Sequence, residues 1–210
     1  MLQIVHKNTS SFFKNAITKY SISQQRQELL IAISNFISEQ LKKKPPVYLN
    51  FIDENNSRIS QLLQVWSAFA IQYFNLQAIH SFSGGITVSS VHKNTIKSLQ
   101  KLGFKFQLLD FFHQNSSYIA SSKNFNEISL VFSKSIYNPA NISPYITIMV
   151  CENPIDISSY IQNSLKTFHL EYPNPTTFDA TLYQSEKYAA LNLQIAAETY
   201  FLFKKIDSFI

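Results

Sequence analysis

Apolar residues recur at helical intervals near the start of the sequence, and this pattern predicts two N-terminal helices. The first covers residues 10–20 and begins with a serine cap. The second covers residues 21–44, with Ser23 as a candidate N-cap. Six side chains at three- and four-residue spacing make its apolar face: Leu29, Leu30, Ile33, Phe36, Ile37 and Leu41. Pro45 and Pro46 end the segment, since proline cannot continue a helix.

Short apolar runs and helical segments alternate over the rest of the chain. Four runs rich in β-branched and aromatic residues predict buried strands at 46–52, 76–83, 145–151 and 167–172. Three stretches with helical periodicity predict helices at 62–73, 89–104 and 181–206. Residues 104–135 are less regular and predict short strands that form a hairpin. Strands that alternate with helices favour an α/β fold around a parallel sheet.

The composition is that of a folded protein with one main core. The chain has 210 residues, of which 45% are hydrophobic. No apolar stretch approaches the roughly 18 to 20 residues of a membrane span, and the N-terminal residues lack the apolar core of a signal peptide. The single cysteine, Cys151, excludes an intrachain disulfide and fits a reducing compartment. We therefore expect a cytoplasmic protein without a membrane partner.

The formal net charge of +5 is concentrated at the N-terminus. Residues 1–50 contain seven Lys or Arg and two Asp or Glu, whereas residues 51–210 contain eleven of each sign. Three lysines, at 42–44, stand at the end of the second predicted helix, where cations suit the helix macrodipole. We interpret them as a solvated helix end. A basic nucleic-acid binder is an alternative, but the sequence has no recognised nucleic-acid module and no stripe of interleaved aromatic and basic residues.

The segment "YLNFIDENNSRISQLLQVW" (48–66) joins a buried strand to an amphipathic helix through a short polar loop. Ligands of α/β folds bind beyond the carboxyl ends of the strands, and a helix N-terminus favours anions. The layout therefore predicts an anion site, yet the first residue of the loop is the acid Asp53. The loop has neither a Walker GK[ST] sequence nor the glycines of a dinucleotide fingerprint.

Residues 53–61, "DENNSRISQ", resemble the Cys-Thr-x-Asn-Ser-x-Arg-Ser-Gln loop of the low-molecular-weight protein tyrosine phosphatases and the thioredoxin-type arsenate reductases. The matching positions are Asn56, Ser57, Ser60 and Gln61. Further along, "SGG" at 83–85 resembles the Ser-Ala-Gly of that family, and "EYPNPTTFD" at 171–179 resembles its late loop with Asp-Pro. The resemblance covers residues 46–206 and looks closest to a longer branch with an N-terminal helical extension.

The resemblance implies a three-layer α/β sandwich around a central parallel four-stranded sheet, with a hairpin insertion. It implies one phosphatase-like domain over residues 46–210 and a helical extension over residues 1–45. It also implies an anion loop to which six residues besides the first belong: Glu54, Asn55, Asn56, Ser57, Arg58 and Ser60. Behind this loop the resemblance places Ser83, Gly84 and Gly85.

Three positions to which the family assigns chemistry hold other residues here. Asp53 stands where a cysteine thiolate attacks phosphorus or arsenic, and Ile59 stands where an arginine grips the oxyanion. Asn174, before a proline, stands where an aspartic acid protonates the leaving group. A redox relay is also incomplete, because Cys151 matches one cysteine of the reductases while the partner position falls near Ser158. The resemblance thus implies a degenerate loop without a confident catalytic residue.

These departures lead to a hypothesis about Asp53. Its carboxylate would act as a built-in anion, held by the backbone N–H groups of the loop, and its pKa would be lowered. Ser57 would hydrogen-bond it, and an external oxyanion would not bind tightly. Arg58 is one residue too early to replace the missing clamp, and we expect it to pair with Glu54 or with solvent.

Two kinds of function follow from this hypothesis. The first is a pseudoenzyme that binds a protein partner through the basic N-terminal helices or the aromatic-rich segment 104–132. The second is a hydrolase with altered chemistry, in which Asp53 is the nucleophile or joins Glu54 with Asp110 or Asp156 around a hard cation. No spacing motif supports such a cation site, so we expect no metal and no cofactor.

The histidines and the cysteine show no pattern of their own. The five histidines (His6, His80, His92, His113 and His169) lack metal-ligand spacing, and we interpret them as hydrogen-bonded structural residues. Cys151, at the end of a predicted strand, is interpreted as a buried or half-buried thiol without a catalytic role.

Overall fold

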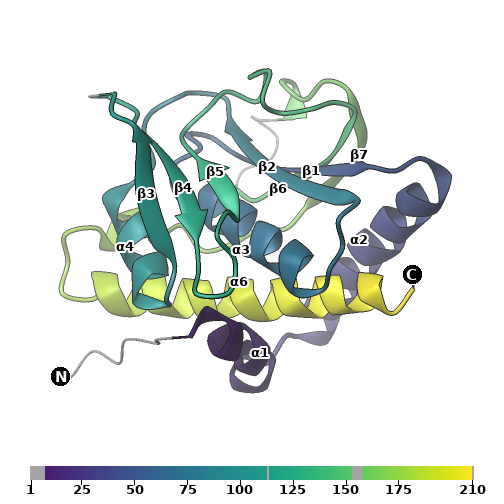
Figure 1. The fold of residues 1–210 in the computed structure, drawn as a ribbon, viewed down its shortest axis with the longest axis horizontal. Coiled ribbons are helices and arrows are strands. Elements are labelled where there is room, and N and C mark those ends of the chain that lie inside the picture. Colours follow the sequence, from purple (N-terminus) through teal and green to yellow (C-terminus); the bar gives the residue numbers. More distant parts are fainter. Residues whose placement is uncertain (1–7, 113, 153–157, 210) are drawn as a thin grey trace.

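The protein is built around a parallel four-stranded sheet with the strand order β2-β1-β6-β7 (Figure 1). The computed structural model describes residues 8–112, 114–152 and 158–209. The four strands are β1 (Val47–Asp53), β2 (Ile79–Gly85), β6 (Tyr145–Met149) and β7 (Ser164–His169). All three neighbouring pairs run parallel. The predicted α/β class and the central sheet of four parallel strands are therefore confirmed.

The bounds of β1 and β6 lie within two residues of the predicted runs, whereas β2 and β7 start three residues away from the predicted positions. Asn75 has a φ of 55°, and the Ile79 N–H donates to the Leu76 carbonyl, so the chain turns before β2 and the strand starts at Ile79. Likewise Asn163, with a φ of 57°, ends a turn before β7, which starts at Ser164. Left-handed asparagines of this kind fix strand ends that apolar runs alone do not show.

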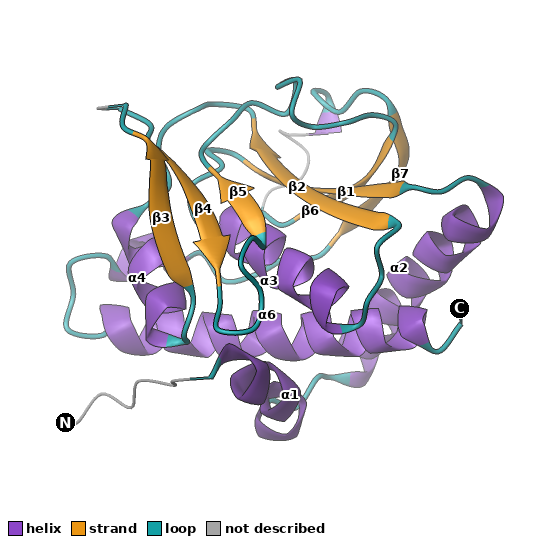
Figure 2. Ribbon diagram, in the orientation of Figure 1, coloured by secondary structure: helices purple, strands orange, loops and turns teal. Residues whose placement is uncertain are grey.

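Helices α3 (Ile59–Tyr73) and α6 (Gln184–Asp207) pack together against one face of the sheet, with α4 (Lys93–Lys101) beside them (Figure 2). Trp66 of α3 is fully buried, and its indole N–H donates to the Asn192 side chain of α6 at 2.9 Å. This bond satisfies a polar group inside an apolar layer, which would otherwise be costly to bury. No helix in the described ranges is long and apolar enough to cross a membrane.

The two N-terminal helices, α1 (Thr9–Lys19) and α2 (Gln24–Lys43), pack on α6. Phe13 of α1 is buried and stacks on Trp66 with ring centroids 5.7 Å apart. The predicted N-cap of α2 is confirmed, because the Ser23 hydroxyl accepts from the Arg26 N–H. The predicted serine cap of α1 is wrong, since the side chain of Asn8 caps that helix.

An antiparallel sheet of three strands stands beside the main sheet (Figure 2). Its strands are β3 (Lys105–Asp110), β4 (Ser117–Ser121) and β5 (Ser129–Val131), in that order. The short strands predicted in this region are thus confirmed, and two successive antiparallel pairs join them into one sheet. Gln61 and Gln64 of α3 donate to the carbonyls of Phe132 and Leu130, so the small sheet is fastened to α3 along β5.

Candidate functional site

The 53–59 loop begins where β1 ends and leads directly into α3. It turns at Asn56, whose φ of 47° is a left-handed conformation that asparagine tolerates better than most residues. The buried Asn56 side chain donates to the Ser60 hydroxyl at 3.0 Å and accepts from the Lys134 N–H at 2.9 Å. The loop is therefore fixed from two sides, by α3 and by the segment that follows β5.

The Asp53 carboxylate points back into this loop. One oxygen accepts from the Asn56 N–H at 2.5 Å, and the other accepts from the Ser60 N–H at 3.1 Å. Ser60 lies in the first turn of α3, and the N-cap residue of that helix, Arg58, makes no capping bond with its side chain. Asp53 therefore caps α3, and its negative charge is stabilised by the helix dipole.

The expected lowering of the Asp53 pKa is wrong in its sign. Burial raises the pKa of the carboxyl group above its ordinary value, although hydrogen bonds from Ser60, Asn56 and Asn55 act in the other direction. Desolvation of the charge outweighs the donors that surround it. The built-in carboxylate is therefore held in place geometrically but is more easily protonated than a solvated aspartate.

Gly85 allows the end of β2 to approach the 53–59 loop. A Cβ atom on Gly85 would lie 2.7 Å from the backbone nitrogen of Asn56, and one on Gly84 would lie 2.8 Å from the Cα atom of Ile136. The Ser83 side chain points elsewhere, because its hydroxyl donates to Gln64 Oε1 of α3 at 2.5 Å. Of the three residues placed behind the loop, Gly85 borders it directly and Ser83 belongs to the interior between β2 and α3.

The Arg58 side chain does not pair with Glu54 or with solvent, as we expected, but with Asp179. Its Nη2 and Nε atoms donate to Asp179 Oδ2 at 2.6 and 3.1 Å, and Nε also donates to the Tyr188 hydroxyl at 3.1 Å. Glu54 is exposed. The prediction failed because Asp179 is brought to Arg58 by the turn ahead of α6, a contact that no local sequence pattern reveals.

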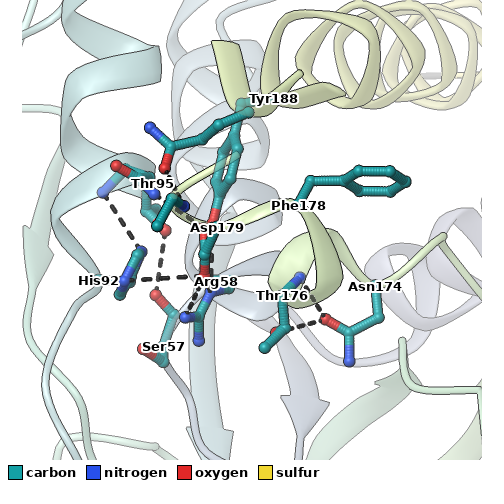
Figure 3. Close-up of polar contacts among 12 residues, drawn as sticks. Ser57, Arg58, His92, Thr95, Asn174, Thr176, Phe178, Asp179 and Tyr188 are labelled. Carbon is teal, nitrogen blue, oxygen red and sulfur yellow. Dashed lines mark hydrogen bonds and ion pairs between the residues drawn. The ribbon is translucent and has the colours of Figure 1, made fainter. Parts of the chain in front are cut away.

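Several further donors converge on Asp179, which lies at the end of the short helix η1 (Pro175–Phe178) (Figure 3). The Asn94 amide donates to it at 2.8 Å and the Tyr188 hydroxyl at 3.0 Å, and His92 Nε2 lies 3.8 Å away. Burial by itself would raise the pKa of Asp179, but the bonds from Asn94, Arg58 and Tyr188 lower it below the ordinary value. The cation of Arg58 is thus neutralised within the protein.

The 53–59 loop forms one wall of a cavity of about 420 Å³. Asp53, Ile59 and Asn174 all line it, so the structure brings together the three positions at which the sequence departs from the phosphatase pattern. Glu54 and Glu152 add two further carboxylates to its lining. Because Arg58 is paired with Asp179, the cavity is dominated by acidic groups.

Ile59 and Asn174 contribute no charge to this cavity. Ile59 is buried, with 5% of its surface exposed. The Asn174 Oδ1 atom accepts from the N–H and the hydroxyl of Thr176, at 3.0 and 2.7 Å, and so caps η1 (Figure 3). Its backbone N–H donates to Glu152 at 3.2 Å. The amide of Asn174 therefore serves the local turn.

No family model matches this sequence, and no curated relative matches it. Solved structures do match. A YwlE mutant from Bacillus subtilis superimposes with a TM-score of 0.53 at 12% identity, over 76% of this chain and 98% of that one. The chain has the low-molecular-weight phosphatase fold. A low-molecular-weight phosphotyrosine phosphatase from Vibrio cholerae O395 gives 0.51 at 12% identity, over 74% and 93% of the two chains.

A third structure with this phosphatase fold is the YwlE arginine phosphatase, in a cysteine-to-serine mutant form with a phosphorylated active-site serine. It matches with a TM-score of 0.51 at 10% identity, over 76% of this chain and 95% of that one. At these identities the likeness establishes the fold, and the resemblance inferred from the sequence motifs is confirmed at that level.

Two other predictions about the loop of this phosphatase fold can be compared with the structure. The Ser57 hydroxyl does not bond Asp53, because it donates to the Ser90 carbonyl at 2.7 Å. The hydroxyl that borders Asp53 belongs to Ser60, which also holds the Asn56 amide. Asn55 is exposed, and its side-chain oxygen accepts from the Thr87 hydroxyl at 2.7 Å. Loop residues thus support the turn mainly through contacts with the segment after β2.

Cys151 follows β6 and lines the same cavity, half-buried. The His169 Nε2 atom lies 2.7 Å from its carbonyl oxygen. Ser158, at the position where a second relay cysteine would be expected, is separated from it by residues 153–157, which lie outside the described part of the chain. Cys151 is the chain's single cysteine, so the thiol has no second cysteine within the chain with which to form a disulfide.

The described residues contain no group of three or more His, Cys, Asp or Glu side chains that could hold a metal ion. Asp110 ends β3 and does not line the cavity, and Asp156 lies outside the described residues. His92 caps α4, and His80 stacks on Tyr48. His6 and His113 also fall outside the described residues.

The sequence patterns did not identify three polar residues that prove to be important in the structure: Asp179, Asn94 and Lys134. Asp179 ends the quoted motif "EYPNPTTFD", and the acid five residues after Asn174 was the available signal. Asn94 lies in a predicted helix, where nothing marks it. Lys134 follows the irregular region, and its burial depends on how the three-stranded sheet packs against α3.

Proposed function

We propose that this protein is a pseudoenzyme with the low-molecular-weight phosphatase fold, which acts by binding a protein partner. One observation carries the proposal: the Asp53 carboxylate accepts from the N–H groups of Asn56 and Ser60. Backbone N–H groups at a helix N-terminus are the donors that a bound phosphate uses. In this protein the Asp53 side chain already accepts hydrogen bonds from two such N–H groups.

The charges around the cavity support the same conclusion. An external phosphate would meet Asp53, and Arg58, the cation among the residues that line the cavity, is paired with Asp179. At about 4 Å and an effective dielectric near 20, each unit of like charge opposes binding by about 4 kcal/mol. A protonated Asp53 would remove that repulsion but would still occupy the donors. Tight oxyanion binding is therefore not expected.

The replaced positions agree with the absence of phosphatase chemistry. The isoleucine side chain at 59 offers no hydrogen bond to an oxyanion, and the Asn174 amide is too weakly acidic to protonate a leaving group. The solved structures of the same fold are named as a phosphotyrosine phosphatase and an arginine phosphatase. We expect this protein to hydrolyse neither phosphotyrosine nor phosphoarginine.

We also propose that the chain consists of one domain with a helical extension and acts in the cytoplasm. Residues 46–210 form the phosphatase-like domain, and residues 1–45 are a helical extension of it. The Arg26–Glu198 ion pair, at 2.8 Å between the half-buried Arg26 of α2 and the buried Glu198 of α6, supports an extension that stays docked. The single cysteine is compatible with work in the cytoplasm.

The test is a titration with phosphate, arsenate and vanadate, followed by calorimetry and by the backbone amide signals of residues 53–60. We expect no binding at millimolar concentrations. The variant Asp53→Ala frees the N–H groups of Asn56 and Ser60, so it should gain phosphate binding, with the largest shifts at those two amides. Asp110→Ala, which removes a carboxylate from the end of β3, is the matched control. We expect this variant to gain no phosphate binding.

Phosphate binding to the unaltered protein, with shifts at Asn56 and Ser57, would contradict the proposal. Magnesium-dependent hydrolysis of a phosphate ester that Asp53→Asn abolishes would instead support an aspartyl nucleophile. Both assays use the full chain, and neither depends on knowing the partner.

A further inference from the structure

Helices α4 and α6 each present one stripe of side chains to a shared groove of about 520 Å³, the α4–α6 groove. Figure 1 shows α4 beside the amino-terminal half of α6. Within each stripe the residues are three or four positions apart, so they lie on one face of their helix. The α4 stripe is Asn94, Lys97, Ser98 and Lys101, and the α6 stripe is Glu186, Ala189, Ala190 and Leu193. The main walls of the groove are therefore two helix faces.

The α4–α6 groove has an apolar interior that is open to solvent. Phe12 of α1 and Leu102 at the end of α4 line it and are buried, whereas Ala189 and Ala190 on its α6 wall are exposed. Because these two alanines are small, another helix can approach the backbone of α6 closely. An open groove cannot enclose roughly 70–90% of a small ligand, as a ligand pocket does. A protein segment, which brings its own cover, suits the groove better.

Two hydrogen bonds fix α4 and α6 relative to each other beside the groove. The Lys101 ammonium donates to the Ser185 hydroxyl at 2.7 Å, and the Asn192 amide of α6 donates to the Ser98 hydroxyl at 3.1 Å. Both walls are thus in place before a ligand arrives. A preformed groove lowers the ordering cost of binding.

The charged side chains of the groove are mainly cations. Three lysines line it, Lys19, Lys97 and Lys101, and the acid among the lining residues is Glu186. None of the ion pairs in the described part of the chain involves any of these four side chains. Lys97 and Lys101 are separated by about 6 Å along α4. Two acids four residues apart on a bound helix would have the same spacing, so the lysines favour an acidic helix.

A second copy of this chain does not offer such a helix. The formal net charge is +5. No described helix carries two acids that are three or four residues apart. Charge complementarity therefore favours a different protein as the occupant of the groove.

We propose that the α4–α6 groove binds an acidic amphipathic helix of a partner protein. The apolar residues of that helix, at three- and four-residue spacing, fill the groove against Phe12, Leu102 and Leu193. Its acidic residues pair with Lys97 and Lys101. In this mode of recognition the apolar anchors supply most of the affinity, and the charges fix orientation and specificity.

This inference rests on the proposed function, because it names the class of partner that the pseudoenzyme binds. The α4–α6 groove shares no lining residue with the acidic cavity beside the 53–59 loop. The two can therefore fail separately. Phosphate binding at the loop would contradict the pseudoenzyme and leave the groove unchanged, whereas a lack of helix binding would leave the Asp53 bonds as they are.

The test uses the full-length protein and two matched libraries of helical peptides of about 14 residues, which span roughly 21 Å. Both libraries carry leucine at positions i, i+3, i+4 and i+7. One has glutamate and the other has glutamine beside the leucines, two residues of similar helix propensity. We expect the glutamate peptides to bind about two- to thirtyfold more tightly, the range for two exposed ion pairs. This difference should shrink at high salt, and the amide signals of Lys97 and Ala190 should shift on binding.

Two sets of variants locate the binding site. Lys97→Gln combined with Lys101→Gln should remove the preference for glutamate. Lys42→Gln combined with Lys44→Gln, at exposed positions at the end of α2, makes the same charge change and should keep the preference.

The second set fills the groove. Ala190→Trp places a large side chain in the groove from an exposed position, so it should lose binding of both libraries. Ala140→Trp makes the same substitution at an exposed position ahead of β6 and should leave binding unchanged.

Equal affinity for the glutamate and glutamine peptides would overturn the proposal, as would retention of neither library or unchanged binding by Ala190→Trp. Binding of a long-chain fatty acid or of anionic vesicles without any peptide binding would also overturn it, because the occupant would then be a lipid. The comparison of the two libraries uses the unaltered protein, so it holds even if a variant alters the fold.

Discussion

Arg58 and Asp179 form an ion pair of 2.6 Å across 121 residues of sequence. The pair joins the N-cap residue of α3, which lines the acidic cavity, to the turn ahead of α6. The Arg58 cation lies next to a loop of the kind that binds anions, but here it is engaged in an ion pair that holds two parts of the fold together.

The Arg58–Asp179 pair should stabilise the fold measurably. Both side chains are about four-fifths buried, and the geometry uses two nitrogens of one guanidinium. We expect a coupling free energy of about 0.5–3 kcal/mol in a double-mutant cycle of Arg58→Ala and Asp179→Ala. Urea unfolding measures it. Arg58→Lys, which keeps the charge but cannot donate from two nitrogens, should recover only part of the coupling. A coupling of zero would show that the pair is incidental.

Asp53 should make the protein less stable as the pH rises. Because its pKa is raised in the folded state, the folded protein binds the proton more strongly than the unfolded chain does. The resulting stabilisation is complete below the unfolded pKa of about 3.8 and is lost as the pH rises through the folded pKa. The free energy of unfolding of the unaltered protein, minus that of Asp53→Asn, should therefore fall across this window and level off above it.

Urea unfolding of both proteins at intervals of half a pH unit checks the prediction. The subtraction removes Asp179, whose lowered pKa gives the opposite slope: its stabilisation is present above the unfolded pKa and is lost as the pH falls. A difference that rises with pH would mean that the donors around Asp53 outweigh its burial.

Removal of Arg26 should be far more damaging than removal of a surface lysine. Arg26 is the ion-pair partner of Glu198, which is 1% exposed and also accepts from the buried Tyr172 hydroxyl. Arg26→Ala leaves the Glu198 carboxylate buried without its ion-pair partner, which should lower the free energy of unfolding by about 3–5 kcal/mol. Lys43→Ala breaks the exposed pair with Glu39 and should cost less than about 1 kcal/mol. Thermal unfolding of the two variants measures the contrast. Equal losses would mean that Glu198 finds another partner or takes up a proton.

Gly85→Ala should disturb the 53–59 loop specifically. The new Cβ atom would lie 2.7 Å from both the Asn56 nitrogen and the Thr87 oxygen, which are backbone atoms and cannot turn away. We expect a loss of about 1–3 kcal/mol, as for other overpacked sites, together with shifted amide signals at residues 53–60. Gly103→Ala provides the comparison, because it strains a φ of 95° at the end of α4. That variant should lose stability while the loop signals stay in place.

The sequence was sufficient for the elements and their order because these depend on local periodicity. The 3.6-residue repeat of α2 and α6 and the apolar runs of β1 and β6 are properties of neighbouring residues. The loop motif then supplied the topology through its resemblance to a known family. The ends of β2 and β7 were misplaced because Asn75 and Asn163 adopt left-handed conformations that the apolar runs do not indicate.

The errors at the candidate site have a different cause. The partner of Arg58 lies 121 residues away, so only the assembled fold brings it into reach. The pKa of Asp53 depends on a balance between desolvation and hydrogen bonding, and the sequence indicates the donors but not the burial. The buried side chain of Lys134 escapes prediction for the same reason, since a lysine in an irregular segment is ordinarily exposed.

Helix α6 packs against α1, α2, α3 and α4. Its residues, 184–207, are synthesised after every other described helix and strand. On the ribosome, those earlier elements therefore remain without their common packing surface until α6 has emerged. The aromatic faces of α1 and α3 stay open to water, or to a chaperone, for most of translation. The apolar side chains that stabilise the finished protein are thus its main aggregation hazard while it is being made.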